Sequence, residues 1–397
     1  MRRLKLNNKE KTFFSGCAGY SRFIYNYGLG LITEYRRTGG TGTNTKVLDA
    51  IKKVFTNYTK KTRKYRWCND YSSRIYSNAF IALKKAFTNQ REGRAKAPKF
   101  KKRKDGKSFT VDSSNGKVLL QAGNKIKIPT LGTFRLHESL SCSYVSQTFT
   151  ISEHAGEWYV SFMVDAERLP IPSGEKWEKC GVDLGIKCFA TVHTHELGTN
   201  EYKSPRPYKK AKAKLRKLQW RNKNKVLGSR WITDTETGKR RKIYITPSKS
   251  AKKYYKRLCL THAKITNVRN DFLHKSSTEL ATTHCVVRLE DLNVKGMMQN
   301  GKLSAAIADQ GFGEFRRQMV YKTNWYGGRV ELVDRFYPSS KKCSNCGHVK
   351  PRLALSERVY HCESCNHVQD RDENAAMNLC YAPAEVVRVA CPEDTDT

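Results

Sequence analysis

The chain has 397 residues, and its 75 lysines and arginines exceed its 36 aspartates and glutamates by 39. A net charge of about 2 to 8 already keeps a small domain soluble, so this excess predicts a polyanionic partner, most commonly nucleic acid. The basic residues run along the whole chain instead of collecting in one amphipathic helix, which favours nucleic acid over a membrane surface. No stretch approaches the roughly 20 apolar residues of a membrane span. The N-terminus lacks the apolar core of a secretory signal, so we expect a cytoplasmic protein without a membrane partner.

The first 168 residues predict helices followed by strands. Apolar residues recur at alternating steps of four and three from 13 to 31, which is typical of an α-helix. The stripe on this helix consists of Phe13, Cys17, Tyr20, Ile24, Tyr27 and Leu31. Helical periodicity continues to about residue 90, and 91–107 is a basic segment with a proline. From about 95 to 168 the period changes to two, with turn dipeptides at Asn115-Gly116 and Ala155-Gly156, so we expect a small antiparallel barrel or sandwich.

The second half predicts a mixed α/β domain, introduced by a proline-containing linker at 169–175. GVDLG and VVRLE have the composition of buried strands, and two long basic helices are expected near 209–225 and 249–280. The lysines and arginines of these helices are expected to follow phosphates. Between them, 228–248 has a hairpin-like pattern that fits RNA contact and a plain surface loop equally well. The acidic tail, 391–397, is expected to be disordered.

Four cysteines form the pattern C-x2-C-x15-C-x2-C, at Cys343, Cys346, Cys362 and Cys365. Two such knuckles supply four thiolates in the tetrahedral arrangement that Zn²⁺ prefers in a closed structural site. Unrelated core cysteines are the plain alternative, and a redox pair would need only one C-x-x-C. Four sulfur ligands leave no position for water, so we expect this zinc to stabilise structure. The pattern predicts a zinc ribbon but no particular function.

Three acids stand in apolar or small-residue contexts: Asp183 inside GVDLG, Glu290 at the end of VVRLE, and Asp372 before a helix rich in alanine. An acid in a hydrophobic strand is costly to desolvate unless it is paired or binds a metal. Taken singly, each acid fits a solvated strand end or an ion pair. Taken together in a chain suited to polyanions, they fit carboxylates around two Mg²⁺ ions that cleave a phosphodiester.

These residues also carry a family resemblance. GVDLGIK, RLEDL and DRDENAAMN, with a cysteine quartet directly before the last, look like the three split motifs of a RuvC-like nuclease domain. Their arrangement resembles TnpB, the RNA-guided nuclease of bacterial insertion sequences, and the related type V CRISPR effectors. The resemblance covers nearly the whole chain and implies that Asp183, Glu290 and Asp372 are the catalytic, magnesium-binding acids. By the family's D-x-N pattern, Asp370 is then a neighbour of Arg371 and not a ligand.

The resemblance further implies a multidomain α+β fold: an N-terminal β-barrel, called the wedge, with a helical recognition insert, and a C-terminal RNase H-like (RuvC) α/β domain with an inserted zinc ribbon. The expected boundaries are 1–10 and 91–168 for the wedge, 11–90 for the recognition insert, 176–337 and 369–390 for the nuclease domain, and 338–368 for a ribbon that binds target nucleic acid.

The expected activity is Mg²⁺-dependent, RNA-guided cleavage of double-stranded DNA beside a short flanking motif, by a monomer that carries one guide RNA from the element's end. A cleavage-deficient RNA-guided repressor and a small type V CRISPR effector are the alternatives. A cut-and-paste transposase is disfavoured because no separate helix-turn-helix is recognisable. The strand-borne acids argue against an RNA-associated zinc-ribbon protein.

Overall fold

The computed structural model describes residues 1–103, 106–164, 177–225, 228–235, 238, 240–354 and 356–391. The expected linker 169–175 and all of the acidic tail beyond residue 391 lie outside these residues. The chain divides into two compact units, Met1–Ala166 and Glu167–Thr397, which are described separately. Within the described residues, no helix combines the length and the apolar composition that crossing a bilayer requires.

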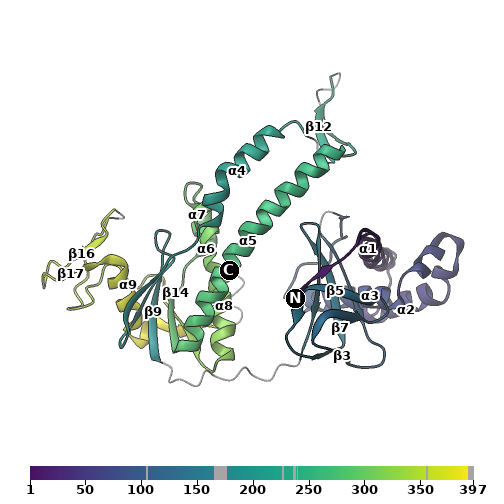
Figure 1. Cartoon of the computed structure of the whole chain (residues 1–397). Helices are drawn as coiled ribbons and strands as arrows, with labels where there is room; N and C mark the ends of the chain where they lie inside the picture. The colour runs from purple at the N-terminus through teal and green to yellow at the C-terminus, as the bar shows by residue number, and fades with distance from the viewer. Residues whose placement is uncertain are drawn as a thin grey trace. The chain divides into compact units, whose positions relative to one another are not determined.

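The first unit combines helices with antiparallel strands (Figure 1). Its helical elements are α1 (Asn8–Arg37), α2 (Asn44–Asn57), η1 (Thr59–Lys61), η2 (Arg63–Asp70) and α3 (Ser73–Arg91). Its strands are β1 (Arg2–Lys5), β2 (Lys107–Asp112), β3 (Val118–Leu120), β4 (Gly123–Ile128), β5 (Gly132–Leu140), β6 (Tyr144–Ser146), β7 (Thr148–His154) and β8 (Glu157–Phe162). The change from helical to strand periodicity near residue 95 is therefore confirmed.

Six strands of the first unit form one antiparallel sheet in the order β2-β7-β8-β1-β5-β4, and β3 pairs with β6. The N-terminal strand β1 lies between β8 and β5, so residues 2–5 belong to the sheet formed after the helices. The expected turns are present: Gly116 adopts positive φ between β2 and β3, and Ala155-Gly156 adopts positive φ between the paired strands β7 and β8. These left-handed conformations suit tight hairpin connections.

The apolar stripe predicted on the first helix is partly wrong. Cys17, Tyr20 and Ile24 are buried, but Phe13 and Leu31 are exposed. The reason is that α1 packs against the sheet, α2 and α3, and its buried face is shifted by about one position. Phe14 takes the place expected for Phe13, and its ring contacts those of Phe109, Phe134 and Trp158.

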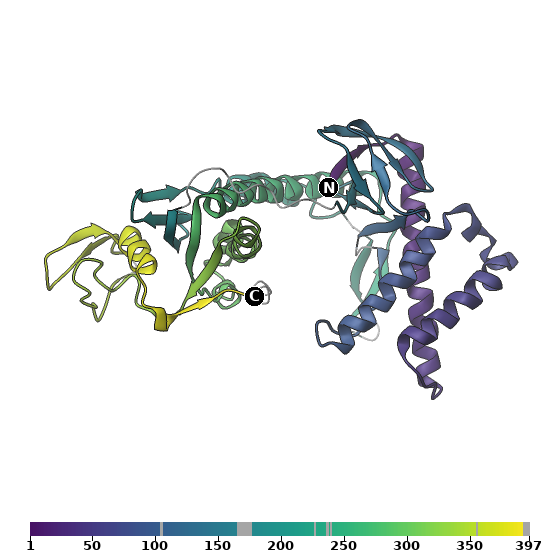
Figure 2. The same cartoon turned by 90° about the horizontal axis from the view of Figure 1, so that it is seen from below.

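The second unit is an α/β arrangement with a projecting helical arm (Figures 1 and 2). Its helical elements are α4 (Pro207–Arg221), α5 (Lys249–Thr283), α6 (Val294–Met298), α7 (Ser304–Gln310), α8 (Phe312–Trp325), α9 (Arg371–Cys380) and η4 (Ala384–Val386). Its strands are β9 (Trp177–Leu184), β10 (Ala190–Thr194), β11 (Gly198–Tyr202), β12 (Ser229–Thr233), β13 (Arg240–Tyr244), β14 (His284–Glu290), β15 (Arg329–Val333), β16 (Val359–His361), β17 (Val368–Asp370) and β18 (Val387–Val389).

The main sheet of the second unit has the order β11-β10-β9-β14-β15-β18. β9, β14 and β15 run parallel, whereas β10, β11 and β18 are antiparallel to their neighbours. One face is covered by α5 and α8, around a core that includes Val182, Phe189, Leu289 and Phe315. Helix α9 packs against β9 and β10 through its buried alanines. The sheet therefore places the ends of two parallel strands, β9 and β14, beside the first turn of α9.

Candidate active site and metal centre

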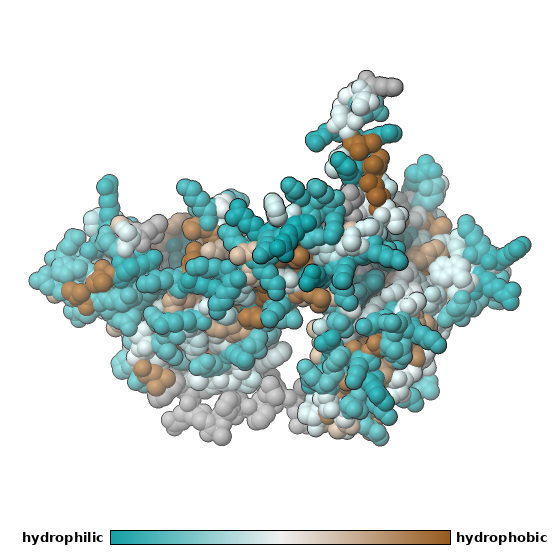
Figure 3. Space-filling view, turned by 45° about the horizontal axis from the view of Figure 1, so that its top comes forward, coloured by the Kyte–Doolittle hydropathy of each residue, from teal (hydrophilic) through white to brown (hydrophobic). Residues whose placement is uncertain are grey.

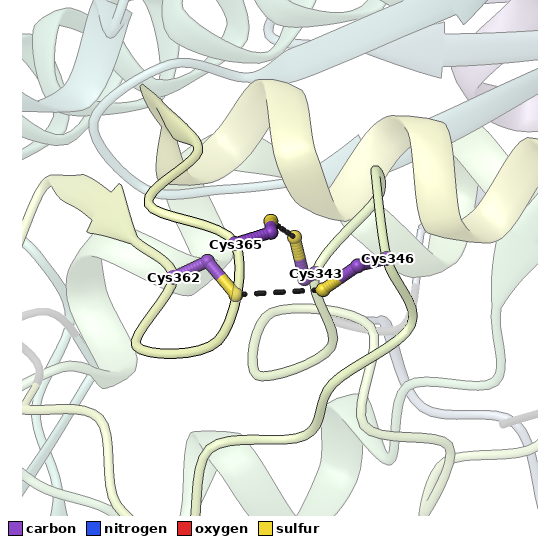
Figure 4. A group of neighbouring side chains, drawn as sticks. All are labelled: Cys343, Cys346, Cys362 and Cys365. Carbon is purple, nitrogen blue, oxygen red and sulfur yellow. Dashed lines mark hydrogen bonds between the residues drawn. The ribbon is translucent and has the colours of Figure 1, made fainter.

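The four cysteines converge on one point (Figure 4). All four sulfur atoms lie within 4.8 Å of one another, with 3.7 Å between Cys343 and Cys365 and 3.6 Å between Cys346 and Cys362. Four sulfurs at about 2.3 Å from a tetrahedral Zn²⁺ would lie about 3.8 Å apart, so the site has the dimensions that zinc requires. The cluster can therefore hold a zinc ion.

The two cysteine pairs have the same local backbone. Gly347 and Asn366 each adopt positive φ directly after a pair, and each donates its N–H to the carbonyl of the pair's first cysteine. The first cysteine of each pair in turn donates its N–H to the carbonyl of His348 or His367. At Cys365, hydrogen bonds from the backbone of His367 and the side chain of Asn345 lower the thiol pKa to about 6. The thiolate, which is the form that binds metal, is thereby favoured.

The segment 338–368, which carries the four cysteines, is called the cysteine module. Two asparagines of α9 attach this module to the helix. Asn374 donates to the Lys342 carbonyl at 2.7 Å, and Asn378 donates to the carbonyls of Ser339 and Lys342 at 2.8 and 2.7 Å. Asn374 also accepts from the Ser344 N–H at 2.9 Å. Both asparagines are buried, so these hydrogen bonds are shielded from water. Two residues of α9 that follow the third acid therefore hold the helix to the start of the cysteine module.

Asp370 caps the N-terminus of α9. Its Oδ1 accepts from the backbone N–H groups of Asp372 and Glu373 at 2.8 and 3.2 Å. This is the interaction that an N-cap carboxylate makes with the unpaired amides of a first helical turn. Asp372 lies in that first turn, with its carboxylate 3.9 Å from the Nε of Arg371. The capping role accounts for Asp370 and leaves the Asp372 side chain at the helix start.

Asp183 lies on the side of β9 that faces α9. Side chains alternate along a strand, and Cys180 and Val182 point into the opposite core, so Gly181 and Asp183 share the other face. A β-carbon at Gly181 would lie 2.2 Å from the Ala376 carbonyl oxygen and 2.3 Å from the Cys380 nitrogen. No side chain fits there. The glycine therefore permits α9 to lie directly on β9, two residues from Asp183.

Glu290 ends the neighbouring parallel strand on the same side. Leu289 pairs with Val182 across β14 and β9, which places Glu290 and Asp183 next in register. Arg288, which shares the face of Glu290, donates to the carbonyls of Cys380 and Ala382 at the end of α9, at 2.9 and 2.8 Å. The side chains of β9 and β14 on this face are thus turned toward α9.

The electrostatics of the three acids are coupled. Burial raises the pKa of Asp183 to about 7, with further increases from the negative charges of Glu290 and Asp372 and a smaller opposing effect from Arg371. Burial and the neighbouring Asp291 also raise the pKa of Glu290. Asp291 itself has a lowered pKa, because hydrogen bonds from Arg388, Arg335 and Arg316 outweigh its own burial. Asp291 therefore forms ion pairs, whereas among the described residues no such partner is found for Asp183 or Glu290.

The acids do not gather as tightly as the cysteines. Across the part of the chain that is described, the four cysteines are the one group of His, Cys, Asp or Glu side chains spaced closely enough to hold an ion. Asp183, Glu290 and Asp372 are near enough to influence one another's charge, but they do not form such a cluster. Metal ions bound by all three acids would require their carboxylates to move closer together.

A second set of residues, missed by sequence reasoning, fixes the loop after β9. Arg206 has a left-handed backbone and donates to the carbonyls of Ile186 and Lys187, and Gln310 donates to the Ile186 carbonyl at 2.8 Å. Buried Asp309 accepts from the N–H groups of Tyr208 and Lys209 at 2.9 and 3.0 Å, capping α4. These contacts join residues between 19 and 124 positions apart, so no local sequence pattern could have indicated them.

The fold is similar to that of a solved Cas12f1 structure. A Cas12f1 chain from a complex with guide RNA and target DNA matches 95% of this chain and 83% of its own, with a TM-score of 0.60 and 14% identity. The protein is thus a mixed α/β multidomain protein of the Cas12f1 kind in its fold.

The sequence comparisons give the family. Residues 161–301 match the IS605 OrfB family, described as "Probable transposase", and residues 312–379 match the Cas12f1-like TNB domain. A Streptomyces pristinaespiralis protein named "Putative RNA-guided DNA endonuclease" is 32% identical over 94% of this chain and 85% of its own. The Escherichia coli K12 protein of the same designation, InsQ, is 28% identical over 95% of this chain and 89% of its own. The chain belongs to the TnpB-like family of RNA-guided DNA endonucleases.

Proposed function

We propose that this protein is an RNA-guided DNA endonuclease of a transposable element, and that Asp183, Glu290 and Asp372 are its catalytic acids. The observation that carries the proposal is the position of Asp183 and Glu290, which lie next in register on adjacent parallel strands on the face that α9 covers. Burial there, with the negative charges of Glu290 and Asp372, raises the pKa of Asp183. Acids that impede one another's ionisation on adjacent strand ends are typical of a metal-dependent catalytic site. The named activity of the relatives supports the same reading.

The proposed domains follow the family. The mixed sheet order, with three parallel strands and an antiparallel pair β10-β11, supports an RNase H-like nuclease domain. The antiparallel sheet of the first unit would be the wedge barrel, and α1–α3 the recognition insert. The cysteine module would be a structural zinc ribbon near the target strand. The protein would act in the cytoplasm as a monomer with one guide RNA.

The carboxylates of Asp183, Glu290 and Asp372 would hold the Mg²⁺ ions. Bound there, Mg²⁺ supplies an activated water and stabilisation of the leaving oxygen. With a pKa of about 7, the carboxyl group of Asp183 is about half protonated at neutral pH, and a bound cation would favour its ionised form. Gly181 seats α9 against β9, and Arg206 holds the loop that follows Asp183. Each of these contacts keeps an acid in position while the substrate binds.

Sequence selection would come from the RNA and not from this site. Pairing between guide and target strand would read the DNA, while the protein reads a short flanking motif on the duplex. The basic helices α4 and α5 would contact phosphates, which contribute affinity and salt dependence without base selection.

The test uses the full chain expressed with the DNA that flanks its gene. We expect a discrete RNA to copurify and the complex to cut plasmids that carry a guide-matched site beside selected flanking sequences, with Mg²⁺. Asp183→Ala should abolish cutting while binding persists. Persistent cutting by Asp183→Ala, or copurification of no discrete RNA, would contradict the proposal.

The adjacent acids Asp370 and Asp372 supply a matched pair of variants. Asp372→Asn should abolish cleavage without a large loss of stability. Asp370→Asn retains a side-chain oxygen that can cap α9, and it should therefore cut at close to the wild-type rate. The reverse pattern would assign catalysis to Asp370.

A further inference from the structure

The β12–β13 ribbon is a two-stranded hairpin at the far end of the arm formed by α4 and α5 (Figure 1). An isolated pair of strands is marginally stable in water, because it has no second layer to cover its apolar side chains. Here Trp231 and Tyr244 are 61% and 84% exposed, and Ile232 and Ile243 are only half-buried. Figure 3 shows hydrophobic side chains on this projecting part, among hydrophilic ones. The ribbon therefore has the character of a surface that a partner covers.

The strand register sorts the ribbon into two faces. Trp231 pairs with Lys242, and Ser229 with Tyr244, so both rings and the lysine lie on one face. The Lys242 ammonium lies 5.9 Å from the centre of the Trp231 ring and 6.0 Å from that of Tyr244. The ammonium thus lies close to two exposed rings, so one face of the ribbon presents both aromatic rings and a positive charge to solvent.

The charge of the surrounding arm is strongly positive. Helix α4 carries seven lysines and arginines and no acid. One side of α4 forms a shallow hollow of about 580 Å³ lined by four of those cations and by Trp220, which is 68% exposed. On the ribbon, Arg230, Arg240 and Arg241 are exposed. A partner that covers this arm must bring negative charge.

We propose that the β12–β13 ribbon binds unpaired nucleotides of the RNA that the protein carries, with Trp231 and Tyr244 stacking on bases and the neighbouring cations contacting phosphates. Exposed rings interleaved with cations suit single-stranded nucleic acid, because every base offers a face for stacking. In RNA, such bases occur in loops and bulges. This inference rests on the proposed RNA-guided function and names one RNA contact within it.

RNA fits better than target DNA as the occupant. A ribbon without its own core needs a partner for as long as the protein is folded, because its apolar faces are otherwise exposed to water. A guide RNA stays with the protein between targets, whereas target DNA is bound only transiently. The ribbon would therefore be covered by RNA before DNA arrives.

The experiment compares three variants of the full-length complex with its copurified RNA. Trp231→Ala/Tyr244→Ala removes both rings. Trp231→Phe/Tyr244→Phe retains stacking, and Ser229→Ala/Thr233→Ala changes the same face without touching a ring. RNA affinity is measured by filter binding. Ribonuclease protection maps the covered nucleotides on the RNA, and deoxyribonuclease protection maps those on bound target DNA.

We expect the double alanine variant to bind RNA at least tenfold more weakly and to lose protection over one short unpaired segment. The phenylalanine and the Ser229/Thr233 variants should stay within about threefold of wild type. Unchanged RNA affinity and protection in the double alanine variant, with guided cleavage intact, would overturn the ribbon proposal and leave the proposed function standing. Loss of protection on the DNA alone would also overturn it. Absence of RNA from the wild-type protein would contradict both the ribbon proposal and the proposed RNA-guided function.

Discussion

Gly181→Ala tests whether the close approach of α9 to β9 positions the proposed catalytic acids. The added methyl group would lie 2.2 Å from the Ala376 carbonyl oxygen, whereas such contacts are essentially never shorter than 3.0 Å. Because the opposing atoms are backbone, the helix itself must retreat by at least 0.8 Å, the difference of the two distances. Asp372, in the first turn of that helix, would move with it.

Two magnitudes follow from this displacement. A misplacement of about 1 Å costs on the order of 100-fold in catalysis, so the cleavage rate should fall by about that factor. Overpacking of a close interface costs about 1–3 kcal/mol of unfolding free energy, which corresponds to a loss of about 2–12 °C in Tm for a unit of this size. Binding of guide-matched DNA should be nearly unchanged, because the basic arm is not involved.

Single-turnover cleavage, DNA binding and thermal unfolding would be measured on the same preparation. Gly301→Ala is the matched control, because its β-carbon would meet nothing within 4 Å. It should cut and melt like the wild type. If Gly181→Ala also cuts at the wild-type rate, the acids do not depend on the contact between α9 and β9, and the assembly of the site described here is wrong.

Three further predictions concern pH, metal and helix capping. The carboxyl pKa of Asp183 is about 7 in the folded chain against an ordinary 3.8, so the folded state holds the proton more tightly and loses stability as pH rises from about 4 to 7. With a metal chelator present, the unfolding free energy of Asp183→Asn should rise relative to that of the wild type by about 4 kcal/mol between about pH 4 and pH 7, as measured by denaturant unfolding. Added Mg²⁺ should reduce this difference in unfolding free energy. A difference that is flat with pH would contradict the raised pKa. Cys343→Ser should reduce the zinc content, measured by mass spectrometry, from one ion per chain and lower cleavage, because the module bonded to Asn374 and Asn378 loses its cross-link; full activity in a zinc-free variant would oppose this. Asp309→Ala should lower the free energy of unfolding by about 1–2 kcal/mol, since two amides of α4 lose their acceptor, and an unchanged denaturation midpoint would show that the cap is dispensable.

Much of the local structure could be predicted from periodicity and spacing. The strands that carry Asp183 and Glu290, the two basic helices and the 228–248 hairpin are present as expected, because each has a local pattern of apolar residues or turn residues. The convergence of the four cysteines could be predicted as well, because metal chemistry restricts their spacing.

Features that depend on tertiary packing could not be predicted. Phe13 and Leu31 follow the helical period but are exposed, because the direction of the buried face depends on what packs around α1. Hydrogen bonds also join distant segments: Asp309 to α4, and Asn374 and Asn378 to the cysteine module. No pattern in the neighbouring sequence predicts these hydrogen bonds. The separation of the three acids is set by β9, β14 and α9 together, and this distance has no sequence signature.

The packing of α9 on β9 also sets an order of events during synthesis. Asp372 is added 189 residues after Asp183, which takes about 10–40 s at ordinary rates of translation. Until the last helix leaves the ribosome, Gly181 and its strand have no surface to cover them on that side. If the basic arm binds RNA as proposed, a nascent chain would begin to bind RNA before its proposed catalytic site is assembled.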